Sequence, residues 1–454
     1  MLVPQGMAYA FLAGMPPIYG LYAGLVPPVV YALFGTSRQL SIGPVAVSAL
    51  LVLAGVSQLA EPGSPEYVRL TVTAGLLIGI TQLLFGTLRL GNISRLLSHP
   101  VLAGFTSAAA IIIAVSQLKD LLGIAIPASE HTYETAYYAA THLGETSLLS
   151  VGFCLTAILA MLAIKQINRR LPAALIVVII GTLLCYAFRL DRQGLAIIRD
   201  VPGGLPAFSV PSFTRADLAI LVPTVLTVTI IGFVESISIA RVFDRQNGTR
   251  EVRPNQEFIA LGLSKIAGSF FQALPSSGSF TRSAVNFDNG AKTALSNVFT
   301  ATVIGLTLLF LTELFYYLPK AILAAIILLA VRSLFDYREA IHLWHTDRLD
   351  LFTMAMTFVL TLLLGIETGV LCGVVLSLLL LFLRIAKPKQ LQVIPDGNKL
   401  RLRGSVYFPQ IDRLRETVAE FAAEHPDYQL DTSGVTGSDS SGKATLEALG
   451  ATHK

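Results

Sequence analysis

The chain has 454 residues, of which 53% are hydrophobic and only 14% charged, with a formal net charge of +4. A soluble chain of this length needs far more charge to cover its surface, so this composition excludes an ordinary soluble protein. Nothing in the charge distribution indicates a nucleic-acid partner. The three cysteines, Cys154, Cys185 and Cys372, lie far apart in apolar segments. They lack metal-ligand spacing, and we expect neither a metal nor a cofactor.

In chain order, apolar runs between polar or Pro/Gly punctuation predict fourteen helices. Several runs are long enough to cross about 30 Å of hydrocarbon, which takes about 20 mostly apolar residues. We therefore expect an all-α polytopic membrane protein. The predicted helices are 1–14, 19–34, 44–59, 68–88, 100–118, 148–168, 172–188, 217–239, 256–272, 280–289, 292–312, 319–334, 350–365 and 367–385.

Basic residues are unequally divided between the two sides of these segments. If the first helix runs outward, fifteen Lys and Arg residues fall on the inner connections and six on the outer ones. Because basic loops stay inside, this bias predicts a multi-pass protein of the cell (inner) membrane with a cytoplasmic C-terminus.

The third and tenth predicted helices are short and occupy equivalent places if each half of the chain holds seven. The third follows Ser41-Ile42-Gly43-Pro44, and the tenth follows Pro275-Ser276-Ser277-Gly278-Ser279. Interrupted segments in matching positions indicate the broken helices of an inverted-repeat transporter, with the binding site near mid-membrane. A pair of ordinary kinks is the alternative.

The start of the tenth helix offers the sharpest candidates for binding an anion. Helix N-termini supply hydrogen-bond donors and positive potential, and Phe280, Thr281 and Arg282 stand at this one. A cation at membrane depth is costly, so Arg282 is predicted to bind the substrate. A structural role, in which Arg282 pairs with a carboxylate or a helix C-terminus, remains an alternative that does not exclude binding.

Glu235 lies in an apolar run, Val222–Ala240, that is otherwise free of charge. A carboxyl group there is a functional candidate by default, and we predict a proton carrier that offsets substrate charge. A permanent ion pair with Arg282 is the alternative. Gln5 and Tyr9 are four residues apart on one helical face and could contact the anion, although such pairs more often serve packing.

The remaining polar features give an enzyme no support. His342, Trp344 and His345 suggest an interfacial amphipathic helix rather than a metal site. No nucleophile–base pairing, phosphate-binding glycine loop or zinc spacing occurs in the sequence.

The character of the chain changes after Lys389. Leu391–Ile394 and Leu400–Arg403 alternate like paired strands around a turn. An amphipathic helix follows, with Ile411, Leu414, Val418 and Phe421 at helical spacing, so residues 389–454 predict a small cytosolic α/β domain.

Several long motifs resemble the SulP family of anion permeases and exchangers, particularly the members called sulfate permeases. They are Val3-Pro4-Gln5-Gly6-Met7-Ala8-Tyr9-Ala10, Pro16-Pro17-Ile18-Tyr19-Gly20-Leu21-Tyr22, Phe34-Gly35-Thr36-Ser37-Arg38-Gln39-Leu40-Ser41-Ile42-Gly43-Pro44, Gly278-Ser279-Phe280-Thr281-Arg282-Ser283-Ala284-Val285-Asn286 and Gly290-Ala291-Lys292-Thr293.

This resemblance implies a seven-plus-seven inverted repeat within residues 1–388 that works by an elevator motion. Helices 1–4 and 8–11 would form a core domain, and helices 5–7 and 12–14 a gate domain. Gln5, Tyr9, Val45, Phe280, Thr281 and Arg282 would surround the anion, and Glu235 matches the acidic position linked with proton coupling. The resemblance also implies a homodimer and coupling to protons or sodium.

The tail resembles a partial STAS domain through Asp431-Thr432-Ser433-Gly434-Val435, Asp439-Ser440-Ser441-Gly442 and Ala444-Thr445-Leu446. Ser441 would occupy the serine that is phosphorylated in anti-sigma-factor antagonists, and a helix N-cap is the alternative role. Ser438 and Lys443 depart from the apolar residues of that family. The short first helix and the early end of the tail lead us to expect a shortened chain with a gap in its core domain.

The leading functional prediction is proton-coupled secondary transport of sulfate. Bicarbonate or dicarboxylate transport and chloride-linked exchange are alternatives for the same site. An uncoupled anion channel and a regulatory membrane protein that acts through its tail are alternatives of another class.

Overall fold

The structure is a computed structural model that describes residues 1–95, 99–127, 131–168, 171–199, 201–247, 251–386, 391–397, 399–406, 411–438 and 445–449. The chain divides into two compact units, Met1–Val374 and Val375–Lys454, and the division falls inside one helix. The boundary expected after residue 388 stays a prediction.

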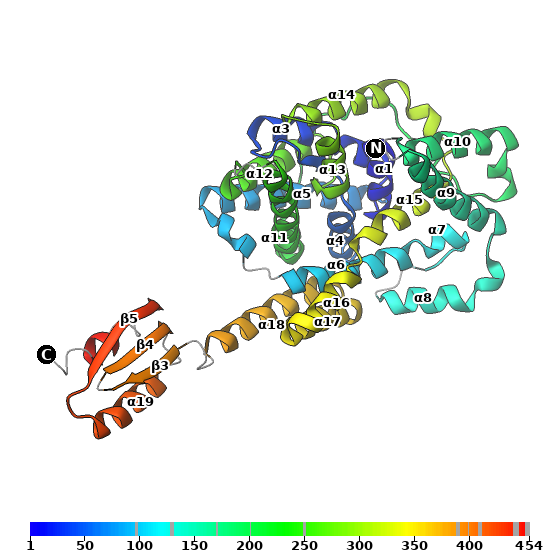
Figure 1. The fold of residues 1–454 in the computed structure, drawn as a ribbon. Coiled ribbons are helices and arrows are strands. Elements are labelled where there is room, and N and C mark those ends of the chain that lie inside the picture. Colours follow the sequence, from blue (N-terminus) through cyan, green and yellow to red (C-terminus); the bar gives the residue numbers. More distant parts are fainter. Residues whose placement is uncertain are drawn as a thin grey trace. The chain divides into compact units, whose positions relative to one another are not determined.

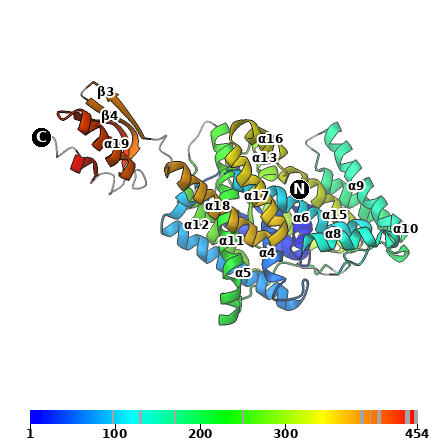
Figure 2. The same cartoon turned by 90° about the horizontal axis from the view of Figure 1, so that it is seen from below.

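The first unit is a helical assembly (Figures 1 and 2). Its first half contains α1 (Leu2–Leu12), α2 (Ile18–Tyr22), α3 (Val26–Phe34), β1 (Ser41–Gly43), α4 (Ala46–Val56), α5 (Pro65–Thr87), α6 (His99–Ser116), α7 (Leu118–Leu122), α8 (Thr132–Thr141), α9 (Leu148–Ile167) and α10 (Ala173–Phe188). Its second half contains α11 (Arg215–Gln246), α12 (Pro254–Phe270), β2 (Ser277–Ser279), α13 (Phe280–Asp288), α14 (Leu295–Phe310), α15 (Lys320–Val331), α16 (Tyr337–Thr346), α17 (Arg348–Leu364) and α18 (Ile366–Ala386), which crosses the division.

Each of the fourteen predicted helices coincides with helical structure, with two notable differences. The predicted helix 19–34 is broken into α2 and α3, because Pro27 and Pro28 stand in the first turn of α3 and have no amide hydrogen to bond to the preceding turn. The predicted helix 217–239 continues to Gln246 as α11. The charged residues beyond Ala240 are good helix formers, so charge alone does not end a helix.

Several helices have the character of membrane spans. By length and composition, Pro65–Thr87, His99–Leu122, Leu148–Ile167 and Asp217–Gln246 can cross a membrane, and shorter apolar helices such as Leu2–Leu12 accompany them. The exposed surface of these helices is rich in Leu, Ile and Phe. Such a surface suits contact with lipid rather than water.

Glycines allow the helices of the first unit to approach closely. A side chain at Gly20 in α2 would overlap the carbonyl oxygen of Gly6 in α1. Between α5 and α12, a Cβ at Gly79 would lie 2.9 Å from the Gly262 carbonyl oxygen, and a Cβ at Gly262 would lie 2.7 Å from that of Gly79. These glycines let the backbone of α1 contact that of α2, and the backbone of α5 contact that of α12.

The second unit contains β3 (Leu391–Asp396), β4 (Lys399–Val406), α19 (Ile411–Glu424) and β5 (Gln429–Ser438). The predicted hairpin is confirmed, since β3 pairs with β4 antiparallel, while β5 joins β4 in parallel. Leu414 and Val418 of α19 are buried against Leu400 and Leu402, as their spacing predicts. At the start of β5, hydrogen bonds from Ser433 and Arg401 lower the pKa of Asp431 to about 2.

Candidate functional site

Two short strands from opposite halves of the chain form the centre of the candidate site. β1 pairs with β2 antiparallel, and Ser41 faces Ser279, Ile42 faces Gly278 and Gly43 faces Ser277. Helix α4 begins after Val45, and α13 begins directly after Ser279. Because the strands run in opposite directions, the two helices leave in opposite directions and their N-termini face each other across the strand pair. The prediction of two broken helices is therefore confirmed.

Serine side chains hold this strand pair in place. The Ser41 amide donates to Ser283 Oγ over 2.9 Å, and the Ser283 hydroxyl donates to the Ser279 carbonyl over 2.6 Å. On β2, the Gly278 amide donates to Ser236 Oγ of α11 over 2.9 Å. Side chains thus satisfy strand amides that have no neighbouring strand, as buried backbone requires.

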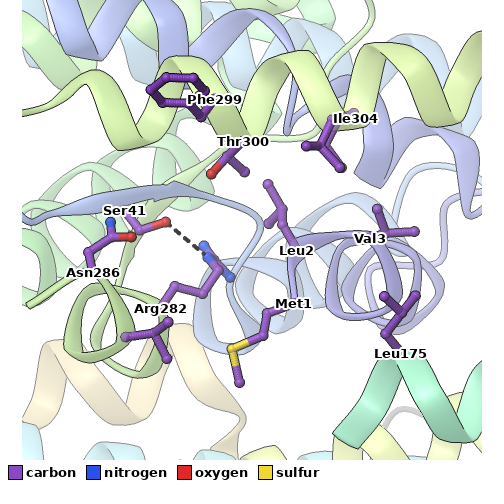
Figure 3. A pocket seen from close by; sticks show the side chains of 12 residues that line it. Met1, Leu2, Val3, Ser41, Leu175, Arg282, Asn286, Phe299, Thr300 and Ile304 are labelled. Carbon is purple, nitrogen blue, oxygen red and sulfur yellow. Dashed lines mark hydrogen bonds between the residues drawn. The ribbon is translucent and has the colours of Figure 1, made fainter. Parts of the chain in front are cut away.

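Arg282 projects from the first turn of α13 toward β1 (Figure 3). Its side chain is buried, and Nη1 donates to the Pro44 carbonyl over 3.1 Å, while Nε lies 3.4 Å from the Ser41 hydroxyl oxygen. Nη2 is buried without a hydrogen-bond partner. The guanidinium is thus anchored on one side and retains a free donor.

A cavity of about 330 Å³ lies in front of this guanidinium. Figure 3 shows the side chains of Leu2, Thr300 and Ile304 around it, with Arg282 and Ser41 on one side. Its lining is Met1, Leu2, Val3, Ser41, Leu175, Arg282, Val285, Asn286, Phe299, Thr300, Val303 and Ile304. An apolar wall with a few convergent polar groups is the usual form of a small-ligand site.

Three other predicted binding residues lie near the strand pair without lining this cavity. Tyr9 is buried in α1, close enough to Arg282 and Glu235 for electrostatic interaction. Gln5 is half-buried one turn earlier, and its Oε1 has no hydrogen-bond partner. Val45 is the N-cap residue of α4. Their contact with an anion stays a prediction.

The structure places Phe280 and Thr281 outside the cavity lining. Phe280 is 53% exposed, and its ring centroid lies 5.5 Å from that of Phe243 in α11. Thr281 is exposed, and its hydroxyl oxygen lies 3.3 Å from that of Ser279. Of the residues predicted to bind the substrate, Arg282 is therefore the one that faces the cavity.

Glu235 lies half-buried in α11, and its Oε2 has no hydrogen-bond partner. The carboxyl group interacts electrostatically with Arg282. Within the described chain, however, no ion pair joins the two residues, so this structure does not contain the pair given as the alternative. An unpaired acid beside an unpaired donor is available to bind a proton.

Sequence reasoning missed one polar residue of the cavity and two buried ionisable residues of α12. Thr300 of α14 lines the cavity opposite Arg282. Glu257 and Lys265 of α12 are both buried, and Lys265 Nζ donates to Gln82 over 3.0 Å. An ionisable residue in an apolar run is the signal that identified Glu235, and it could equally have identified Lys265. Ser441 lies outside the described residues.

The arrangement fits one class of protein. A helical membrane assembly with two opposed broken helices and an unpaired guanidinium between them has the arrangement expected of a membrane transporter fold. Within the described residues, no group of three or more His, Cys, Asp or Glu side chains could hold a metal ion.

Residues 1–357 match the model of the Sulfate permease family, and the chain belongs to that family. It is 41% identical over 371 residues to the chloroplastic Sulfate transporter 4.1 of Arabidopsis thaliana, in a match that covers 80% of this chain and 53% of that relative. The chain thus spans about half the length of this relative. These relatives are named as transporters and not as enzymes.

Solved structures show the same fold. The murine Solute Carrier 26 family member A9 anion transporter in the inward-facing state superimposes with a TM-score of 0.88 at 25% identity, covering 100% of this chain and 82% of the other. The transmembrane domain of a cyanobacterium bicarbonate transporter, BicA, gives a TM-score of 0.72 at 23% identity, covering 81% and 93%. The expectation of a helical polytopic membrane fold is confirmed.

Proposed function

We propose that this chain carries sulfate across the cell membrane, coupled to protons, by an elevator-type alternating-access mechanism. One observation carries the proposal: Arg282 Nη2 is a buried, unpartnered donor that stands at the N-terminus of α13 and faces a cavity. A second N-terminus, that of α4, opens across the strand pair. A divalent oxyanion suits one guanidinium and two helix termini better than a halide does, because both of its charges are matched.

Glu235 is the proposed coupling residue. It experiences the positive charge of Arg282 without forming an ion pair with it. An anion bound at Arg282 would cancel part of that positive potential and favour a proton on Glu235. Binding linkage is reciprocal, so a proton on Glu235 would favour the anion equally. Sulfate and proton would then cross together, and the bound group would carry less net charge.

The arrangement of helices supports an elevator motion. In both overall views, α11 and α12 gather at one end of the first unit and α9 and α10 at the other (Figures 1 and 2). The strand pair, α13 and α11 are joined by buried hydrogen bonds, including those of Ser236 and Ser283. Such a connected group can move as one body past its neighbours.

Proteoliposome uptake of radiolabelled sulfate across a pH gradient tests the proposal. We expect an acidic donor side to stimulate uptake in the parent, and Arg282→Gln to reduce uptake at least tenfold. Arg192→Gln, which removes an exposed arginine, is the matched control and should retain parental uptake. Parental uptake by Arg282→Gln would overturn the assignment of the site.

Proton coupling has its own variant. Glu235→Gln cannot carry a proton, so we expect downhill sulfate exchange to persist while stimulation by the pH gradient disappears. Glu134→Gln, which changes an exposed glutamate of α8, should leave the stimulation intact. If Glu235→Gln keeps the full proton dependence, Glu235 has no part in coupling.

Bicarbonate or dicarboxylate transport and chloride-linked exchange remain alternatives for the same cavity. Competition by bicarbonate, fumarate and chloride in one sulfate assay separates them from sulfate transport. Currents larger than carrier turnover allows would instead favour an uncoupled channel.

The tail is proposed to be a cytosolic partial STAS domain, on the support of its mixed sheet and of α19. A regulatory phosphorylation of Ser441 and a homodimeric assembly complete the proposal.

A further inference from the structure

One aromatic ring at the end of α1 is contacted by two ammonium groups. Lys119 Nζ and Lys320 Nζ each lie 5.6 Å from the ring centroid of Phe11. Lys119 belongs to α7 and Lys320 is the first residue of α15, so both cations come from helices other than the one that carries the ring. These three residues are called the Phe11 cluster below.

The Phe11 cluster lies at the opposite end of α1 from the Arg282 cavity. Leu2 lines that cavity, and Phe11 follows nine residues later in the same helix. At 1.5 Å per residue, the two positions are about 13 Å apart along the helix axis. The Phe11 ring therefore lies at the end of α1 that is remote from the Arg282 cavity.

The charges of the cluster are not balanced. Asp120, next to Lys119, is the acidic group that interacts electrostatically with both lysines. Its Oδ2 is buried without a hydrogen-bond partner, so this oxygen does not bond either ammonium group. With Arg199 and Asp191, which line a hollow beside Lys320, three cations and two carboxylates leave a net positive charge. Each cation–π contact is worth only about 0.5–1 kcal/mol at such a site, so the contacts can break and re-form.

A hollow of about 600 Å³ adjoins the cluster at Lys320. Arg199 and Lys320 line it together with Asp191 and Tyr316. Its walls are tied by backbone bonds, since the Arg199 amide donates to the Tyr316 carbonyl over 3.0 Å and the Lys320 amide donates to the Ala196 carbonyl over 2.9 Å. Backbone hydrogen bonds therefore fix the walls of the hollow, and Arg199 and Lys320 make it cationic.

We propose that the Phe11 cluster is the closed gate of the transport path on the side opposite the Arg282 cavity, and that its lysines collect the divalent oxyanion when the gate opens. This inference rests on the proposed alternating access. While α1 packs against α15, both ammonium groups are engaged in cation–π contacts with the Phe11 ring. When α1 moves away, both lysines are released from the ring, Lys320 faces the hollow beside Arg199, and a dianion can replace the ring. The same cations thus close the empty path and attract the next substrate.

Sided transport measurements test the collecting role. Sulfate uptake is measured in intact cells and in everted membrane vesicles, which present the two faces in turn. For Lys119→Gln combined with Lys320→Gln, we expect KM to rise about tenfold from one face and to stay within twofold of the parent from the other. Lys165→Gln combined with Lys292→Gln removes the same charge from exposed positions and should change neither value. Equal changes from both faces, or none, would overturn the collecting role.

Cysteine cross-linking tests the gate without relying on transport. In a background with the three native cysteines replaced by serine, Phe11→Cys and Lys320→Cys should be joined by a bifunctional maleimide, whose spacer replaces the reach of the Phe and Lys side chains. Phe11→Cys paired with Gly152→Cys of α9 serves as the control and should not cross-link. Absence of the first cross-link would overturn the gate, even in a protein that transports sulfate. If the cross-link forms but neither the parent nor its variants transport sulfate, the proposed function is wrong, while the contact between Phe11 and Lys320 is still confirmed.

Discussion

Glu257 shows how one buried residue can organise a binding site that it does not touch. Its Oε2 accepts from the Tyr31 hydroxyl over 2.8 Å, and its Oε1 accepts from the Thr36 amide over 2.6 Å, from the Thr36 hydroxyl over 2.5 Å and from the Ser37 amide over 3.2 Å. Thr36 and Ser37 lead directly into β1. The carboxylate therefore fixes the approach of the chain to the strand pair, and it is a positioning residue.

We predict that Glu257→Gln destabilises the protein by about 3 kcal/mol or more, because an amide nitrogen cannot accept the bonds that a carboxylate oxygen accepts. Thermal unfolding in detergent, followed by circular dichroism, measures the loss. Tyr31→Phe removes one of the four bonds and should cost about 1–2 kcal/mol. Equal stability of Glu257→Gln and the parent would show that the carboxylate does not anchor this segment.

For single residues, the sequence predicted which side chains carry the chemistry better than it predicted where those side chains point. Arg282 and Glu235 were identified because an ionisable side chain in an apolar run needs a reason. Phe280 and Thr281 were expected to join Arg282 because they stand with it at the start of the tenth helix and match the family's binding positions. Neighbours in a helix point about 100° apart, however, so adjacent residues seldom share a cavity, and the rotation of α13 is set by packing that the sequence does not reveal.

Among the helices, the contact between α1 and α2 allows a sharp test. A Cβ at Gly20 would overlap the Gly6 carbonyl oxygen, which is backbone and cannot rotate away. We predict that Gly20→Ala costs about 2–3 kcal/mol of stability through overpacking. Gly152→Ala is the matched control, because nothing lies within 4 Å of a Cβ there.

A glycine-to-alanine change inside an unobstructed helix stabilises by up to about 1 kcal/mol, so Gly152→Ala should keep or raise the melting temperature. Both variants can be compared by thermal unfolding in the same detergent. A melting temperature of Gly20→Ala equal to that of Gly152→Ala would contradict the close approach of α1 and α2.

The elements themselves were largely predictable, and their partners were not. Lipid cannot satisfy backbone groups, so each span has to be a long apolar run that is visible in the sequence. Punctuation by Gly, Pro and Ser also indicated the breaks before α4 and α13. The register of β1 on β2 joins residues more than 230 positions apart, and no local pattern encodes it.

For the whole molecule, α16 provides a probe of how the first unit meets the membrane surface. Tyr337, Ile341 and Trp344 lie on one face of this helix and are exposed, while Leu343 is buried with Ala103 and Met354. An exposed apolar face with an aromatic residue suits the boundary between headgroups and hydrocarbon. The expectation of an amphipathic helix is consistent with this pattern, and its place at the interface stays a prediction.

Trp344 is the single tryptophan of the chain, so its fluorescence reports this position alone. We predict that lipids brominated close to the headgroup quench Trp344 in liposomes more strongly than lipids brominated near the chain ends. Aqueous iodide should quench it weakly. Strong quenching by iodide together with none by brominated lipid would place α16 in water.

The strand pair also constrains the order in which the protein can be made. β1 leaves the ribosome long before β2, which begins at Ser277. Until then, the backbone of Ser41–Gly43 has no strand to pair with, in a solvent that offers no substitute. Until β2 is synthesised, the backbone amides of β1 must therefore form hydrogen bonds with other parts of the first half of the chain, with water or with the insertion machinery. The candidate site at the strand pair can consequently form only late in biosynthesis.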